Sequence, residues 1–230
     1  DHINIAENDQ IKIFNDYFKI FPWDEIDKKK SIGIDIGCGS GRWSKFVADN
    51  TKDLILLDPS VQALDVAKKN LNKKKNIRFL NQSVGEISLE DNSIDVAYSL
   101  GVLHHIPDIK SALKEINRIL KPNAPFLVYL YYSFDNKPKF YKFIWMLTNP
   151  IRYFISKLPF KIKFVITFLI AIFIYFPFAR ISKLLKFFKL PYQNIPMWQY
   201  ADLSFYIMKT DALDRFGTKV EKRYSRRQII

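Results

Sequence analysis

The chain has 230 residues, of which 48% are hydrophobic and 26% are charged, and its formal net charge is +13. This apolar fraction excludes a disordered protein and is large enough for a buried core. A single cysteine, Cys38, excludes a disulfide framework and favours a reducing, cytoplasmic setting. The first ten residues lack the basic and apolar regions of a secretory signal, so none is expected.

Strands and helices are expected to alternate through the first part of the chain. A helical stripe over residues 8–21 ends at Pro22 and precedes this alternation. Strands are expected at 28–37, 52–60, 76–83, 93–100 and 124–132, and helices at 40–50, 60–74, with Ser60 as N-cap, and 108–121. Residues 1–135 are therefore predicted to form a doubly wound α/β core, with helices on both faces of a mainly parallel sheet.

The pattern changes after Asp135. Residues 136–230 contain 18 Lys and Arg but only 4 Asp and Glu, and no acidic residue lies between Asp135 and Asp202. Such a charge balance favours an anionic membrane surface, another polyanion or an acidic substrate. Residues 136–200 are predicted to form a basic, aromatic insert of helices after the fifth strand, and residues 201–230 a return segment and the start of a core helix.

Prolines are expected to break the helices of the insert near positions 150, 159, 177 and 191. The longest uncharged run, residues 164–179, has 16 positions and contains Pro177. A membrane span needs about 20 apolar residues, so this run is not expected to cross. It could be a core or dimer helix, a lid over a pocket, or an anchor on a membrane surface.

A glycine loop follows the first expected strand, in the sequence SIGIDIGCGSGRW at residues 31–43. Glycines at 37, 39 and 41 permit a tight turn and let a ligand approach the backbone. A dinucleotide fingerprint would need glycine at position 42, which is Arg42, and a phosphate-binding P-loop would end in Gly-Lys-Ser/Thr. Asp58 lies at the end of the next strand, where a carboxylate can accept the two hydroxyls of a ribose.

Four motifs in order make residues 30–132 resemble a class I S-adenosylmethionine-dependent methyltransferase. They are the glycine loop, LILLDPS, DNSIDVAYSLGVLHHIPD and INRILKPNAPFLVYL. The resemblance implies S-adenosylmethionine as cofactor, and it implies that the last two strands of that fold are absent from this chain. It also implies a cofactor site made of Asp35, Gly37, Cys38, Gly39, Gly41, Asp58, Pro59, Ser83, Val84 and Ser99.

Within that site the resemblance assigns separate roles. Asp35 organises the loop, whose backbone lines the methionine end of the cofactor, and Asp58 binds the ribose. Ser83 and Val84 would meet the adenine, although many relatives have an Asp-Ala pair there. Because a serine accepts a hydrogen bond less strongly than a carboxylate, the adenine contact departs from the family pattern.

Two neighbouring histidines, His104 and His105, follow the fourth strand. One of them could remove a proton from the methyl acceptor, since histidine titrates near neutrality. The alternative, which we favour, is that they shape the pocket, because aligned methyl transfer needs no base. No group of residues has metal-ligand spacing, so no metal is expected. The sequence after the fourth strand, Ser99-Leu-Gly-Val, lacks the motif of nucleobase amino-methyltransferases.

The sequence therefore predicts an enzyme that methylates an oxygen, nitrogen or carbon atom of a small, lipophilic or membrane-associated acceptor. Nucleic acid is not expected as a partner, because the aromatic residues of the insert form an apolar block instead of interleaving with charges. The protein is expected in the cytoplasm, with possible attachment to the inner face of a membrane. Two alternatives stay open: a cofactor-binding scaffold without turnover, and a membrane-interaction protein that acts through its insert.

Overall fold

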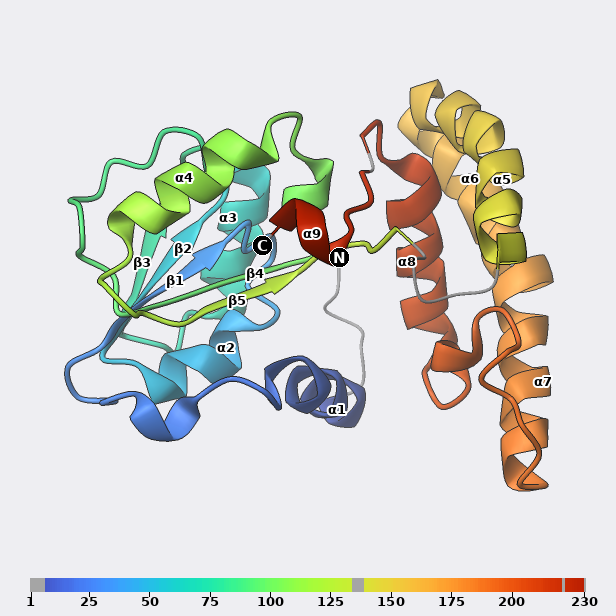
Figure 1. Cartoon of the computed structure of the whole chain (residues 1–230), viewed down its shortest axis with the longest axis horizontal. Helices are drawn as coiled ribbons and strands as arrows, with labels where there is room; N and C mark the ends of the chain where they lie inside the picture. Colours follow the sequence, from blue (N-terminus) through green and yellow to red (C-terminus); the bar gives the residue numbers. More distant parts are fainter. Residues whose placement is uncertain (1–6, 134–138, 221, 230) are drawn as a thin grey trace. The chain divides into compact units, whose positions relative to one another are not determined.

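The computed structural model describes residues 7–133, 139–220 and 222–229 (Figure 1). Within it the chain forms two compact units. The first holds Ile11–Tyr131 and Lys222–Tyr224, and the second holds the helices from α5 to α9.

The first unit is built on a sheet of five strands, all of them parallel. The strand order is β3-β2-β1-β4-β5, so the direction of winding reverses between β1 and β4. This is the doubly wound α/β sheet that the sequence predicts, and its ligands bind beyond the carboxyl ends of the strands at such a reversal. The strands are β1 (Ile32–Ile36), β2 (Asp53–Leu57), β3 (Ile77–Leu80), β4 (Val96–Leu100) and β5 (Phe126–Tyr129).

Helices cover both faces of this sheet, with α1 and α2 on one side and α4 on the other (Figure 1). On the first side, Leu54, Leu56 and Tyr98 of the strands pack against Phe14 and Phe18 of α1 in one apolar cluster. The helices of this unit are α1 (Glu7–Phe18), α2 (Ser44–Val47), α3 (Val61–Asn70) and α4 (Ile109–Ile119), with short 3-10 turns η1 (Trp23–Glu25), η2 (Ala48–Asn50) and η3 (Leu103–His105).

Helix α2 is much shorter than the sequence predicts. Instead of a helix over residues 40–50, four helical residues are followed by the 3-10 turn η2. Gly39 and Gly41 both have positive φ angles, which a right-handed helix does not allow, so the helix cannot start until the loop has turned. The prediction for α3 is confirmed, since the Ser60 side chain accepts a hydrogen bond from the Ala63 amide as its N-cap.

All the named elements of the second unit, within its described residues, are helices or helical turns. Its helix α8 packs against α5 and α6, so the segment expected to return to the core from residue 201 stays with the insert. Only Lys222–Tyr224 rejoins the first unit, where the Tyr224 amide donates to the Tyr131 carbonyl at 2.9 Å. The elements are α5 (Lys139–Lys157), α6 (Phe160–Ile170), the π-helical turn η4 (Ala171–Tyr175), α7 (Phe176–Phe187), η5 (Trp198–Tyr200), α8 (Phe205–Gly217) and α9 (Arg226–Ile229).

Two of the four expected proline breaks are wrong. Pro159 separates α5 from α6, and Pro191 follows α7, but Pro150 lies inside α5. Pro177 lies within an uninterrupted helical run, Phe160–Phe187. Just before it, the Phe176 amide donates to the Ala171 carbonyl five residues back, and this wider π turn accommodates a residue that has no amide proton.

The run Phe160–Phe187 has 28 residues and is, among the described residues, the one helix long and apolar enough to cross a membrane by length and composition. Only 22% of its most apolar window is buried. The 16-residue uncharged run, which by itself is short for a membrane span, is therefore part of a longer helix that Pro177 does not break.

Candidate functional site

The glycine loop lies at the carboxyl end of β1, where the winding of the sheet reverses. The amides of Gly37 and Cys38 both donate to the Leu57 carbonyl at the end of β2, at 2.8 and 3.1 Å. The Gly41 amide donates to the Cys38 carbonyl at 2.9 Å and closes the turn. The loop is thus tied to the neighbouring strand and to itself before any ligand is present.

The loop glycines have two different roles. A β-carbon on Gly37 would lie 2.4 Å from a methyl of Val102, and one on Gly41 would lie 2.5 Å from a methyl of Leu71, so both glycines are required by packing. Gly39 also has a positive φ, but nothing lies within 4 Å of the position of its missing β-carbon. Gly39 therefore borders the open space in which a ligand can approach the backbone.

Gly101, just after β4, repeats this arrangement and was missed by the sequence analysis. Its φ is +78°, and nothing lies within 4 Å of its missing β-carbon. A glycine directly after a strand is a turn signal that could have identified it. Gly39 and Gly101, which both have open space and a positive φ, follow β1 and β4, the two strands between which the winding reverses.

Asp58 follows β2 and holds the loop through its carboxylate. One oxygen, Oδ2, accepts from the Gly39 amide at 2.9 Å, and Oδ1 accepts from the Ser60 amide at 2.9 Å. The side-chain amide of Asn81 donates to the Asp58 carbonyl, also at 2.9 Å. Because each carboxylate oxygen can accept more than one hydrogen bond, Asp58 keeps acceptor capacity for the hydroxyls of a ribose.

Asp35 is buried inside the first unit, where it hydrogen-bonds two neighbouring elements. Its Oδ2 accepts from the Ser44 hydroxyl at 2.6 Å and from the Tyr98 hydroxyl at 2.7 Å, which joins β1 to α2 and β4. Burial raises the pKa of Asp35 to about 7, although both hydrogen bonds oppose the rise. Nothing in the residue pattern marks Ser44 and Tyr98 as its partners, because Tyr98 is 63 residues away in sequence.

Three other expected site residues have different surroundings. Cys38 is buried, and its thiol pKa is raised, first by burial and then by the nearby Asp35 and Asp58, so the thiol stays neutral. The buried Ser99 hydroxyl donates to the Ile36 carbonyl at 2.9 Å and links β4 to β1. Pro59 is exposed directly after Asp58.

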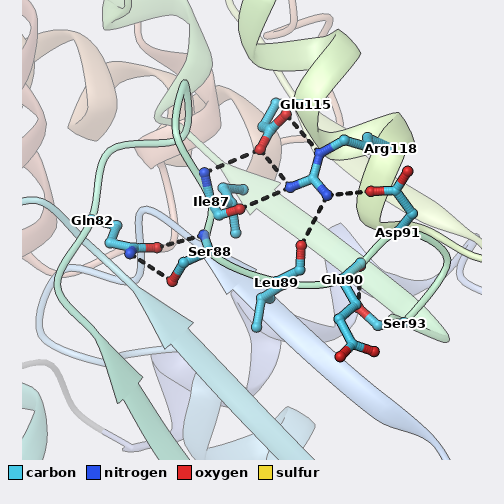
Figure 2. A network of polar contacts seen from close by, with 9 residues as sticks. All are labelled: Gln82, Ile87, Ser88, Leu89, Glu90, Asp91, Ser93, Glu115 and Arg118. Carbon is cyan, nitrogen blue, oxygen red and sulfur yellow. Dashed lines mark hydrogen bonds and ion pairs between the residues drawn. The ribbon is translucent and has the colours of Figure 1, made fainter.

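The segment after β3 carries Ser83, which is exposed, and Val84, which is buried. A polar network on α4 holds the part of the chain that follows them (Figure 2). The Arg118 guanidinium donates to the carbonyls of Ile87 and Leu89 at 2.8 and 2.9 Å, and Glu115 accepts from the Ile87 amide at 3.1 Å. Sequence reasoning missed this network, which fixes a long connection that has no helix of its own.

The two histidines differ in exposure. His104 is fully buried, and its ring stacks on Tyr131 with the centroids 3.9 Å apart. His105 is half-buried, with its ring centroid 4.1 Å from that of His104. The backbone carbonyl of His104 also accepts from the Lys222 amide at 2.9 Å. His104 thus belongs to the packed interior, and His105 is the more exposed of the two histidines.

The residues present fit the cofactor that the resemblance implies. Gly39 and Gly101 leave room for it next to the backbone, and Asp58 offers a carboxylate at the position where the fold binds a ribose. The amides of Gly37, Cys38, Gly39 and Gly41 already donate within the protein. In such a site the loop would supply shape and space, and Asp58 would supply the charge.

Residues 34–128 match the family model described as "Methyltransferase domain". A demethylmenaquinone methyltransferase of Staphylococcus aureus is 35% identical over 102 residues, which are 42% of this chain and 42% of that protein. The chain thus matches less than half the length of this relative. The family match covers β1 to β5 and all the expected cofactor residues.

Solved structures resemble the chain more distantly. The YcgJ protein of Bacillus subtilis has 19% sequence identity and a TM-score of 0.49, covering 63% of this chain and 60% of that one. An S-adenosylmethionine-dependent methyltransferase of Aquifex aeolicus has 20% identity and a TM-score of 0.43, covering 59% of this chain and 79% of that one. With TM-scores below 0.5, these likenesses add nothing to the family match.

Proposed function

We propose that the chain, whose residues 34–128 match a methyltransferase domain, transfers a methyl group from S-adenosylmethionine to a small, lipophilic acceptor. The acceptor atom is an oxygen, a nitrogen or a carbon. The observation that carries the proposal is the geometry at the reversal of strand order. Open space lies at Gly39 and Gly101, and the Asp58 carboxylate accepts a hydrogen bond from the Gly39 amide.

When bound, S-adenosylmethionine supplies a methyl group on a positively charged sulfur, and an acceptor atom held in line can displace it. In this proposal the residues of the chain position the reactants. Asp58 accepts the ribose hydroxyls, and the backbone at Gly39 and Gly101 permits close approach. His105, half-buried after β4, takes a proton from an acceptor that must lose one, while His104 packed on Tyr131 shapes the wall.

A lipophilic acceptor is supported by two observations. The relative from Staphylococcus aureus is named for demethylmenaquinone, a lipophilic quinone. The second unit of the chain also exposes many large apolar side chains, among them Phe154, Phe160 and Phe173. The first acceptor to test is therefore a demethylated quinone, followed by total lipid extracts.

Calorimetric titration with S-adenosylmethionine tests the cofactor site. Asp58→Ala should weaken binding at least roughly tenfold, because it removes charged acceptors for the ribose hydroxyls. Asp53→Ala is the matched control, because Asp53 begins β2, at the opposite end of the strand from Asp58. This variant should bind S-adenosylmethionine with the affinity of the wild type. Gly39→Val should also lose affinity, because its side chain would enter the open space. Equal affinity in all four proteins would contradict the cofactor site.

Transfer of a radioactive methyl group tests the reaction itself. The full chain is incubated with methyl-labelled S-adenosylmethionine and either demethylated quinone or lipid extract, and the label is followed into the organic phase. We expect label in that phase with wild type and not with Asp58→Ala. Normal cofactor affinity without label in any acceptor pool, aqueous extracts included, would instead identify a cofactor-binding scaffold.

A further inference from the structure

The continuous helix α6–η4–α7 of the second unit carries large apolar side chains on its exposed face and small or polar ones on its buried face. Its buried positions recur every three or four residues and carry small or polar side chains: Thr167, Ala171, Tyr175, Ala179 and Ser182. Its exposed positions carry large apolar ones: Phe164, Val165, Leu169, Phe173, Ile174, Phe176, Phe178 and Ile181. A helix on the surface of a water-soluble domain has the opposite distribution.

Helix α5 repeats this arrangement. Arg152 and Ser156 are buried together with Ile155, and the exposed large apolar side chains are Phe140, Phe143, Ile144, Met146, Leu147, Ile151, Tyr153 and Phe154. Such an extent of exposed apolar surface marks an interaction site rather than the scattered apolar residues of an ordinary surface.

The polar groups inside this unit bind one another and the backbone. Arg152 Nε donates to the Arg215 carbonyl at 2.6 Å, and Lys163 Nζ donates to the carbonyls of Ser156 and Gly217 at 3.0 and 2.8 Å. The Tyr175 hydroxyl lies 3.3 Å from Asp211 Oδ2. Polar side chains of membrane-embedded helices likewise face the interior and pair there, and small residues are common where such helices meet.

The flanking charges indicate what covers the apolar exterior. Residues 164–179 contain no charged residue, and at about 1.5 Å per residue they extend roughly 24 Å. Lys161 and Lys163 precede this run, and Arg180 and Lys183 follow it. With no acidic residue between Asp135 and Asp202, a second copy of the chain would bring like charges together, whereas anionic lipid headgroups complement them.

The same run indicates how deeply the helix enters the lipid. A helix that lies flat at a membrane surface needs a polar face toward water. The most polar side chains of residues 164–179, Thr167 and Tyr175, are both buried inside the unit. The outward positions are apolar all round, as in a helix surrounded by hydrocarbon.

We propose that the exposed faces of α5 and of α6–η4–α7 are immersed in the hydrocarbon of a bilayer with anionic headgroups, with their flanking lysines at the headgroup level. This inference does not depend on the proposed reaction, since it rests on the burial pattern and the charge distribution of the second unit. It replaces the lid and the core or dimer helix among the three readings of the insert.

Depth-dependent fluorescence tests the immersion in the full chain. Phe173 is 71% exposed, so Phe173→Cys carries an environment-sensitive label, and Ile20→Cys, at a site 75% exposed in the first unit, is the matched control. The native Cys38 is buried and labels poorly. With vesicles of phosphatidylglycerol and phosphatidylcholine, the label at 173 should shift to the blue and be quenched most by bromines in the middle of the acyl chains. The label at 20 should change little.

Three outcomes would overturn the proposal. The label at 173 could keep its water-like emission when vesicles are added. It could be quenched most by bromines next to the headgroups, which would place the helix at the surface. Its emission could already be blue-shifted without vesicles and depend on protein concentration, which would assign the apolar face to a second copy of the chain.

A charge placed on the same face gives an independent test. Phe173→Lys should reduce the fraction of protein that stays on vesicles after an alkaline, high-salt wash, by roughly a hundredfold in partition coefficient. Ile20→Lys should partition like the wild type. Both sites are exposed, and circular dichroism with S-adenosylmethionine titration verifies that both variants are folded. Equal partitioning of Phe173→Lys and wild type would contradict immersion.

Discussion

At the scale of single residues, Asp35 links the stability of the first unit to pH. Its carboxylate is buried between β1, α2 and β4, and it accepts hydrogen bonds from the neutral hydroxyls of Ser44 and Tyr98. Neutral hydroxyls stabilise an anion less than a positive charge would, so desolvation prevails and the pKa rises to about 7.

This residue leads to a prediction for the pH dependence of unfolding. The folded protein holds the Asp35 proton up to about pH 7, whereas the unfolded chain releases it near the ordinary value of 3.8. The folded state thus binds more protons between about pH 4 and pH 7, and the contribution of Asp35 to the free energy of unfolding falls as pH rises through that window, by at most roughly 1.4 kcal/mol per pH unit. Asp35→Asn should remove this slope in denaturant titrations across the window. An unchanged slope in the variant would contradict the assignment.

The three glycines of the loop follow from the sequence, but their different surroundings follow from the packing. The spacing of Gly37, Gly39 and Gly41 predicts a tight loop, and all three have positive φ angles. Which of them faces a ligand depends on Val102 and Leu71, side chains that are remote in sequence and fill the space at the other two. The sequence therefore identifies the loop, and the packing identifies Gly39 as the glycine that borders open space.

At the scale of elements, the connection between β3 and β4 depends on α4 for its shape. Arg118 binds the carbonyls of Ile87 and Leu89 and the carboxylates of Asp91 and Glu115 (Figure 2). One guanidinium with five donors can hold several turns of irregular chain in this way. The expected adenine contacts, Ser83 and Val84, lie just before the part that Arg118 holds.

We expect Arg118→Met to loosen this connection without unfolding the unit. Hydrogen exchange at the Ile87 amide, which donates to Glu115, should accelerate by roughly tenfold, because its acceptor loses the partner that orients it. Lys114→Met on the same helix is the control, and its exchange at Ile87 should match that of the wild type. Equal protection in the Arg118 variant would show that the connection is held by other contacts.

Element boundaries in the second half of the chain illustrate a different limit of sequence reasoning. A proline signals a break because it lacks an amide proton, and this holds at Pro159. At Pro177 the π turn of Ala171–Tyr175 adjusts the helix ahead of the ring, so the helix continues. Such an adjustment depends on how the buried face of Phe160–Phe187 packs, and the residue pattern alone does not show that packing.

At the scale of the whole molecule, the proposed immersion assigns separate effects to charge and apolar surface: the charge asymmetry would speed association with a membrane, and the apolar exterior would slow release. Residues 136–230 carry a net charge of +14. Long-range attraction of this kind is screened by salt, since the Debye length falls from about 10 Å at 0.1 M to about 3 Å at 1 M. Hydrocarbon contacts are not weakened by salt in this way.

The two contributions can be separated by kinetics. Association with anionic vesicles, followed by light scattering, should slow by roughly tenfold between about 0.1 M and 1 M NaCl. Release of protein already bound should not accelerate over the same range. Rapid release at high salt would show that only the basic side chains hold the protein to the membrane.

By itself the sequence determined the alternation of strands and helices, the glycine loop, the acidic residue after the second strand and the uneven distribution of charge. These are local patterns, because each depends on residues close together in the chain. The tertiary structure decided which glycines border open space, which hydroxyls bind Asp35, and that the small and polar side chains of Phe160–Phe187 face inward while its large apolar ones face out. Those features depend on contacts between residues far apart in sequence, and a helix with apolar residues on every side gives no local signal of which face is buried.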